Sequence, residues 1–271
     1  MSNFENKKVL ITGGASGIGL LMGIRAMELG ASHFIIWDIN AQLMESVINE
    51  ITTSGKTALG YRVDVSNADE VEAASKMLLQ NNLLPDILIL NAGIVSGKFF
   101  HTHEKGEIER TINVNVLGCM LPARAFLPAM IARGNGHIVS ISSAAGLLAN
   151  PKMAVYAASK WAVYGWSESL RLEMQALKTG IQITTVTPSF IDTGMFDGVK
   201  TNPIIPKLSP DKAVRKIIRG VQKNIIFVRM PFMVYTLPLV KGILPVRWFD
   251  VLVGKGLGVY KTMQAFTGRK P

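Results

Sequence analysis

The sequence predicts an α/β fold in which helices cover both faces of one doubly wound parallel sheet. Short apolar runs alternate with longer helix-like segments over the first 190 residues. The runs are continuous in β-branched and other apolar residues, which is typical of strands that are buried on both faces. Repeated strand–helix units of this kind place successive strands parallel to one another.

Each element is predicted from an apolar or periodic segment and from the residues that end it. Strands are expected at residues 7–12, 33–38, 57–65, 86–90, 137–142 and 181–187. Helices are expected at residues 17–30, 41–54, 68–81, 105–131 and 153–178. Gly30 and Gly55 end the first two helices, because glycine suits a helix C-terminus. Ser66 or Asn67 caps the third helix.

The pattern changes after Pro188. Residues 192–208 carry Gly, Asp, Asn and Pro and predict a long loop, a type of segment that is often functional in a compact domain. A helix at 209–223 and a strand at 224–229 follow. We expect a single domain, in which residues 1–195 form a Rossmann-like core for cofactor binding and catalysis. Residues 196–271 add the substrate loop, the last strand and an apolar, basic extension.

Composition narrows the class of protein. Of the 271 residues, 48% are hydrophobic and 18% are charged, which is typical of a packed globular chain. The single cysteine, Cys119, allows no intrachain disulfide and is expected to be a small buried residue, which is consistent with a reducing compartment. We expect a cytoplasmic location. The N-terminus enters a strand-like run directly and lacks the pattern of a signal peptide.

The positive charge is concentrated near the end of the chain. Residues 1–199 hold 15 Lys/Arg and 17 Asp/Glu, whereas residues 200–271 hold 14 Lys/Arg and only two acidic residues, Asp211 and Asp250. Residues 225–261 mix aliphatic and aromatic residues with spaced Lys and Arg. Pro231 and Pro238 interrupt this stretch, so no membrane-spanning helix is expected there.

Two interpretations of residues 225–261 stay open, and they can coexist. The segment could cap the substrate pocket and contribute an oligomer contact. It could also lie peripherally on an anionic membrane surface, with apolar side chains in the interface and Lys/Arg at the headgroups. Nucleic acid is not an expected partner, because the basic residues are interleaved with bulky apolar ones.

A glycine-rich turn, TGGASGIG at residues 12–19, joins the first strand to the first helix. Its glycines let the backbone approach a ligand, and the helix N-terminus favours a pyrophosphate. Asp38 ends the second strand about 20 residues further on, where a carboxylate can bond both ribose hydroxyls. It could instead cap the next helix. Asp38 would repel a 2′-phosphate, and residues 13–19 contain no Lys or Arg, so NAD is favoured over NADP.

Tyr156 and Lys160 are four residues apart in a predicted helix and therefore lie on one face. Alone, such a pair could be ordinary packing beside a surface charge. In its context, the sequence resembles the short-chain dehydrogenase/reductase family over about residues 7–195. The matching motifs are TGGASGIG, Asp64-Val65, Asn91-Ala92-Gly93, Asn115, Ser143, the YxxxK of Tyr156 and Lys160, Pro188 and Thr193. Ser143 lies 13 residues before Tyr156, the family spacing, and is preferred over Ser142. Ser189 stands where the family most often has Gly.

The resemblance implies the site residues and their roles. Cofactor binding is implied for Gly13, Ser16, Gly17, Ile18, Gly19, Asp38, Asp64, Val65, Asn91, Ala92, Gly93, Tyr156, Lys160, Pro188, Ile191 and Thr193. Tyr156 would be the general acid/base, with its pKa lowered by Lys160 and by oxidised nicotinamide. Ser143 would hold the substrate oxygen, and Asn115 would hold a water in a proton relay.

The segments FIDTGMFDG and FTGRK resemble the branch of this family that handles retinoids, hydroxysteroids and other long lipophilic alcohols. The expected function is therefore NAD-dependent interconversion of a lipophilic alcohol and its carbonyl. The alternatives are an NADPH-dependent ketoacyl or carbonyl reductase and a non-catalytic NAD-binding, membrane-associated protein. The family also implies a homodimer or homotetramer through the outer faces of helices 105–131 and 153–178. His101 and His103 are expected to be exposed loop residues, and no metal site is expected.

Overall fold

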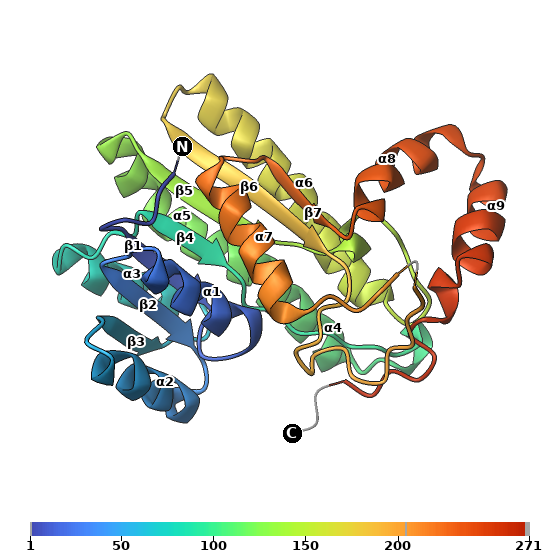
Figure 1. Cartoon of the computed structure of the whole chain (residues 1–271), viewed down its shortest axis with the longest axis horizontal. Helices are drawn as coiled ribbons and strands as arrows, with labels where there is room; N and C mark the ends of the chain where they lie inside the picture. The colour runs from blue at the N-terminus through green and yellow to red at the C-terminus, as the bar shows by residue number, and fades with distance from the viewer. Residues whose placement is uncertain (1, 204, 269–271) are drawn as a thin grey trace.

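The computed structural model describes residues 2–203 and 205–268 and shows one seven-stranded, all-parallel sheet (Figure 1). The strand order is β3-β2-β1-β4-β5-β6-β7. The order reverses between β1 and β4, and ligands of such sheets bind at the carboxyl ends of the strands at this switch point. The predicted fold class is confirmed.

The strands and helices follow the predicted order. The strands are β1 Lys8–Thr12, β2 His33–Asp38, β3 Ala58–Arg62, β4 Ile87–Leu90, β5 Gly136–Ile141, β6 Ile181–Pro188 and β7 Phe227–Met230. The helices of the core are α1 Gly17–Glu28, α2 Ala41–Thr53, α3 Ala68–Gln80, α4 Lys105–Ile112, α5 Gly118–Arg133, α6 Ala154–Ala176 and α7 Pro210–Gln222. Asn67, rather than Ser66, caps α3, because its side chain accepts from the amides of Asp69 and Glu70.

Two apolar layers sandwich the sheet. Side chains of α1, α2 and α7 form one layer with strand residues such as Ile11 and Ile36. Side chains of α3, α5 and α6 form the other with Leu10, Leu88 and Ile138. Adjacent strand residues thus enter opposite cores, which explains why the strand sequences are apolar without alternation.

The predicted helix 105–131 differs from the structure in one respect. A π-helical segment, Asn113–Leu117, interrupts it between α4 and α5. The whole stretch Lys105–Arg133 has the length and apolarity of a membrane span. It is a core element here, because Cys119, Phe126 and Met130 are buried in the layer described above.

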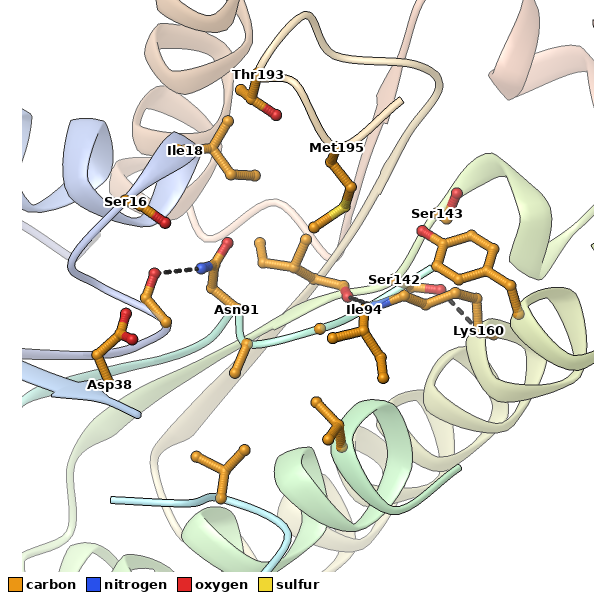
Figure 2. A pocket seen from close by; sticks show the side chains of 18 of the residues that line it. Ser16, Ile18, Asp38, Asn91, Ile94, Ser142, Ser143, Lys160, Thr193 and Met195 are labelled. Carbon is orange, nitrogen blue, oxygen red and sulfur yellow. Dashed lines mark hydrogen bonds between the residues drawn. The ribbon is translucent and has the colours of Figure 1, made fainter. Parts of the chain in front are cut away.

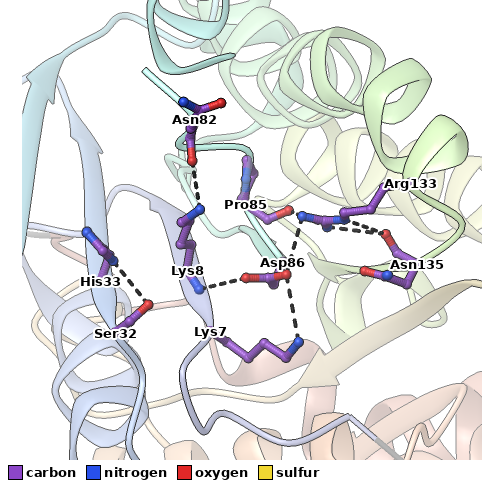
Figure 3. A network of polar contacts seen from close by, with 9 residues as sticks. All are labelled: Lys7, Lys8, Ser32, His33, Asn82, Pro85, Asp86, Arg133 and Asn135. Atoms are coloured by element: carbon purple, nitrogen blue, oxygen red, sulfur yellow. Dashed lines mark hydrogen bonds and ion pairs between the residues drawn. The ribbon is translucent and has the colours of Figure 1, made fainter. Parts of the chain in front are cut away.

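The amino end of the sheet is fixed by a polar network around Asp86 (Figure 3). The Asp86 carboxylate accepts from the Lys8 amide at 2.9 Å and pairs with Arg133 at 3.3 Å. Arg133 in turn donates to the carbonyl of Pro85 at 2.9 Å. This network joins β1, β4 and the end of α5 on the edge opposite to the switch-point crevice.

Beyond β7 the chain forms helices that the sequence analysis did not predict. They are α8 Met233–Ile243, α9 Val246–Phe249 and a π-helical segment Asp250–Gly256, called here the tail helices. The tail helices project outward beyond the end of β7, beside α6 (Figure 1). Their inner side chains Val234, Leu237, Phe249 and Val253 form an apolar cluster that packs on Leu147 and Leu148.

Candidate active site

A cavity of about 610 Å³ lies at the switch point, along the carboxyl ends of the strands. Asp38 and Ser16 lie at one end of it, and Ser143 and Lys160 lie at the other (Figure 2). Of the residues predicted to bind the cofactor, all except Gly19 line this cavity. The predicted catalytic residues Ser143, Tyr156 and Lys160 also line it, whereas Asn115 does not.

The glycine-rich turn has the geometry of a close backbone approach. Gly13 and Gly17 have φ values of 65° and 57°, a left-handed region that favours glycine. A Cβ on Gly19 would lie 2.2 Å from the carbonyl oxygen of Gly13, so Gly19 serves the turn's own packing. A Cβ on Gly17 would meet only Thr193, at 3.9 Å, so the backbone there faces open space. The turn therefore leaves room for a phosphate group at the N-terminus of α1.

The Asp38 carboxylate is held by two backbone amides. One oxygen accepts from Ala15 and the other from Asn40, each at 3.0 Å. Asn40, and not Asp38, caps α2 through a bond from the Leu43 amide. Asp38 thus remains at the cavity wall beside the turn, where a carboxylate suits ribose hydroxyls. The residues present therefore fit a dinucleotide.

The opposite end of the cavity brings together Ser143, which follows β5, and Tyr156 and Lys160 on α6. The Ser143 hydroxyl accepts from the Ala145 amide at 3.1 Å, and it lies within hydrogen-bonding reach of the Tyr156 phenol. The Lys160 ammonium lies 5.8 Å from the centre of the Tyr156 ring and donates to the Ile141 carbonyl at 2.9 Å. Ser142 has a different task, since its hydroxyl donates to the Lys160 carbonyl at 2.8 Å.

Burial dominates the electrostatics of this pair. It raises the pKa of Tyr156 to about 12, and the hydrogen bond with Ser143 opposes that rise. Burial also lowers the pKa of Lys160. The predicted lowering of the Tyr156 pKa is therefore not a property of the protein alone, because desolvation disfavours the phenolate more than these neighbours favour it.

Asn115 lies behind the cavity wall in the π-helical segment and is fully buried. Its side-chain amide donates to the Ile94 carbonyl and to the Ser159 hydroxyl, both at 2.9 Å. Its oxygen accepts from the Ile94 amide at 2.8 Å. Both side-chain N–H groups are thus used by protein partners, and the side chain joins α6 to the chain segment after β4.

A second, smaller cavity of about 80 Å³ adjoins the first at Ser143, Ser189 and Phe196, which line both. Its walls are almost entirely apolar. They include Leu148, Met153, Phe190, Ile205, Met233, Val234, Leu237, Val253 and Val259. The tail helices thus cap this cavity, as one interpretation of residues 225–261 predicted.

Side chains from residues 144–153 and 194–260 line the apolar cavity, and Ile94 lines the large one. Arg110 and Phe196 line the large cavity and were not predicted. The rings of Phe190 and Phe196 lie 5.2 Å apart and form an aromatic part of the apolar cavity's wall.

The prediction that His103 is exposed is wrong. Its imidazole is fully buried, lies tilted with its centre 6.4 Å from that of the Phe100 ring, and is 3.7 Å from the Glu107 carboxylate. His101 is exposed, as predicted. Cys119 is buried, as predicted, and burial raises its pKa to about 11. Among residues 2–203 and 205–268, no group of three or more His, Cys, Asp or Glu is arranged to hold a metal ion.

The strand order and the glycine turn at its switch point define a nucleotide-binding α/β protein. Comparison with known proteins makes the class more specific. The family model for short chain dehydrogenase matches residues 7–203. Epidermal retinol dehydrogenase 2 of Mus musculus is 37% identical over 99% of this chain and 87% of its own length. Estradiol 17-beta-dehydrogenase 11 of Pongo abelii is 33% identical over 91% of this chain and 82% of its own length.

Solved structures agree on the fold. A short chain dehydrogenase/reductase from Burkholderia phymatum in complex with NAD has a TM-score of 0.79 at 23% identity, over 94% of this chain and 97% of that one. A gluconate 5-dehydrogenase from Burkholderia cenocepacia in complex with NADP and tartrate has a TM-score of 0.75 at 25% identity, over 84% and 94%. The chain belongs to the short-chain dehydrogenase family, and it is an oxidoreductase of that family.

Proposed function

We propose that the protein is an NAD-dependent oxidoreductase that interconverts a lipophilic alcohol and its carbonyl. One observation carries the proposal: Ser143 and Tyr156 stand where the large cavity meets the apolar one. A substrate carbon in the apolar cavity would then face the nicotinamide end of the large cavity. A bound nicotinamide cofactor would supply the hydride acceptor or donor.

The chain's own residues manage the proton and the orientation. Tyr156 takes the proton of the alcohol in oxidation and returns it in reduction. Ser143 fixes the substrate oxygen beside the phenol. Lys160 supplies a buried positive charge near the phenol ring, and that charge favours the phenolate. Asn115 fixes α6 to the segment at Ile94 through hydrogen bonds to Ser159 and Ile94. These bonds support a role in positioning the site rather than direct contact with the substrate.

The preference for NAD rests on Asp38 and its surroundings. A 2′-phosphate placed on the ribose would meet the Asp38 carboxylate, and the neighbouring side chain Ile39 offers no positive charge. The glycine turn from Gly13 to Gly19 contains no Lys or Arg. Repulsion by Asp38, with no cation supplied by Ile39 or the glycine turn, favours the cofactor that lacks the phosphate.

The lipophilic substrate class rests on the apolar cavity and on the relatives. The names of two curated relatives specify a retinol and an estradiol dehydrogenase. The cavity of about 80 Å³ is smaller than the roughly 300 Å³ of a typical pocket for a drug-sized ligand. We infer that the tail helices shift outward when a long alcohol binds.

The test is a cofactor and substrate panel read at the absorbance of reduced nicotinamide. We expect turnover with NAD and with long apolar alcohols, including retinol and hydroxysteroids, and little with short or polar ones. Tyr156→Phe should lose turnover and keep NAD binding. Activity confined to NADPH and ketoacyl substrates would instead identify a carbonyl reductase. Unchanged biological activity of the Phe variant would identify a non-catalytic NAD-binding protein.

We also propose that the protein is a homodimer or homotetramer through α5 and α6. Ile131 on α5 and Leu172 on α6 are exposed apolar side chains on the outer faces of these helices. Sedimentation velocity on the purified chain tests this, and a monomer at all concentrations would contradict it.

A further inference from the structure

The tail helices carry an unusual outer surface. Seven large apolar side chains on and beside them are between 50% and 77% exposed: Phe232, Leu239, Ile243, Val246, Trp248, Val251 and Leu252. We call this set the outer apolar face. Soluble monomers rarely expose apolar residues in such a concentration, and patches of this kind mark protein or membrane contacts.

Helical spacing places these residues on a side opposite to the pocket. Along α8, Phe232, Leu239 and Ile243 are separated by seven and four residues and share one stripe. Val234 and Leu237 occupy the other side and line the apolar cavity. In the π-helical segment Val251 and Leu252 are exposed while Val253 is buried. The tail helices are therefore apolar on both sides: the inner side lines the apolar cavity, and the outer side is exposed.

Basic residues border the outer apolar face. Arg247, Lys255 and Lys261 are exposed and, within the described part of the chain, take part in none of the ion pairs. The only acidic residue in 231–261 is Asp250, and Tyr260 donates a hydrogen bond to its carboxylate. Lys241 is used differently, since its ammonium lies 4.1 Å from the centre of the Trp161 ring and fixes α8 to α6.

A protruding apolar face with a cationic border and almost no acidic residues fits an anionic lipid surface. We propose that the outer apolar face docks on an anionic membrane, with Trp248 and Ile243 in the interface and Arg247 and Lys255 at the headgroups. A second copy of the chain is the competing occupant. Pairing two copies through this face would bring like charges together across the contact, which disfavours that arrangement.

The docked orientation has a consequence for the substrate, and this part rests on the proposed function. The side chains that wall the apolar cavity and those of the outer apolar face belong to the same helices. A lipophilic alcohol dissolved in the bilayer would therefore reach the cavity past α8 and α9 without crossing water.

Binding is tested on the full chain, without cofactor or substrate, by sedimentation with vesicles of phosphatidylcholine with and without phosphatidylserine. We expect binding only to the vesicles that contain phosphatidylserine, weakening as salt is raised. Ile243→Gln with Trp248→Gln should abolish it. The matched control, Leu43→Gln with Leu177→Gln, replaces two apolar residues that are exposed outside the tail helices and should bind like the parent.

The charged border is tested separately. Arg247→Gln with Lys255→Gln should lower the partition coefficient by roughly fivefold for each residue, the value of one Lys or Arg near an anionic surface. Lys178→Gln with Lys212→Gln removes the same amount of positive charge from outside the tail helices, and it should lower the partition coefficient much less. Equal loss in both pairs would show that net charge alone, and not this border, drives binding, and would overturn the proposal.

Three further outcomes overturn it. The parent chain could remain in the supernatant with both kinds of vesicle. The Ile243/Trp248 variant could sediment like the parent. The same variant could convert a dimer to a monomer in the absence of lipid, which would assign the face to a contact between copies. Because this assay needs no turnover, docking and the proposed dehydrogenase activity can fail independently. If both hold, the variant's KM should rise for an alcohol supplied in vesicles and stay unchanged for the same alcohol in detergent micelles.

Discussion

The ammonium of Lys160 lies 5.8 Å from the centre of the Tyr156 ring and donates its hydrogen bond to the Ile141 carbonyl rather than to the phenol. Both side chains are buried. Burial raises the pKa of Tyr156 to about 12 and lowers that of Lys160. Burial by itself therefore favours the protonated phenol. Under the proposed function, the positive charge of a bound oxidised nicotinamide would then be needed before Tyr156 could accept a proton.

Replacing Lys160 should shift the pH dependence of alcohol oxidation. Lys160→Met removes the nearest buried positive charge, so the pKa of Tyr156 in the cofactor complex should rise by about one unit or more. The rise of kcat/KM with pH should move to correspondingly higher pH, which a pH–rate profile measures. Lys152→Met, a loop lysine outside both cavities, is the matched control. An unshifted profile in Lys160→Met would show that its charge does not act on the phenol.

Changing Asp38 should change the choice of cofactor. Asp38→Ser with Ile39→Arg removes the carboxylate and adds a cation where a 2′-phosphate would lie. A charge-assisted hydrogen bond contributes about 1.5–3 kcal/mol, so kcat/KM for NAD should fall roughly ten- to a hundredfold while that for NADP rises. Ile39→Arg alone separates the two effects. If the parent enzyme already prefers NADP, the role proposed for Asp38 is wrong.

Enlarging the apolar cavity should favour bulky alcohols. Leu237→Ala removes a side chain of α8 that lines the cavity. The ratio of kcat/KM for a hydroxysteroid to that for a linear alcohol should increase, because less displacement of the tail helices is then needed. Truncation of a buried Leu costs about 2–5 kcal/mol of stability, so thermal unfolding is measured in parallel. Leu170→Ala, which truncates a buried residue of α6 that lines neither cavity, is the control for stability loss alone.

His137 should make stability depend on pH in the acid range. Its ring nitrogens lie 3.0 Å from the Ser2 hydroxyl and 2.8 Å from the Thr184 hydroxyl, and burial lowers its pKa to about 4. The unfolded chain takes up the proton near pH 6.5 and the folded chain only near pH 4. The stabilisation is therefore complete above pH 6.5 and is lost as pH falls through 4.

The loss amounts to roughly 3 kcal/mol of unfolding free energy between these two pH values. His137→Gln keeps hydrogen-bonding capacity without a titrating ring and should flatten this part of the curve. Denaturant unfolding at a series of pH values measures it. His101→Gln, on an exposed loop, should leave the curve unchanged. A parent curve that is already flat from pH 6.5 to 4 would contradict the assignment.

The sheet and its order of elements could be predicted because burial on both faces forces continuous apolar strands. Val9, Leu10 and Ile11 show why, since consecutive residues enter the two opposite cores. Asp38 and Asn91 could be predicted too, because they stand at the carboxyl ends of those strands, whereas Tyr156 and Lys160 were predicted from their match to the YxxxK motif of the family. Cavity-lining Phe196 could not, because it lies in a loop whose path no periodicity fixes.

The π-helical segment and the tail helices could not be predicted from the sequence. The π-helical segment around Asn115 depends on hydrogen bonds from one amide to Ile94 and Ser159, which are distant in the chain. The tail helices escaped prediction because Pro238 lies inside α8 and Pro245 precedes α9, a pattern that ordinarily breaks helices. The rise that burial causes in the Tyr156 pKa could not be predicted, because the cost of burial depends on packing, which the motif does not encode.

The two cavities share Ser143, Ser189 and Phe196, but the large cavity takes side chains from before residue 140 and the apolar cavity takes side chains from residues 231–261. Asp38, Asp64 and the glycine turn come from the first quarter, whereas Met233, Val234, Leu237 and Val253 come from the last. Exchanging residues 231–261 for the corresponding segment of a relative would therefore alter what the enzyme accepts while leaving its nucleotide chemistry in place. Such chimaeras make this fold a modular starting point for engineering new substrate ranges.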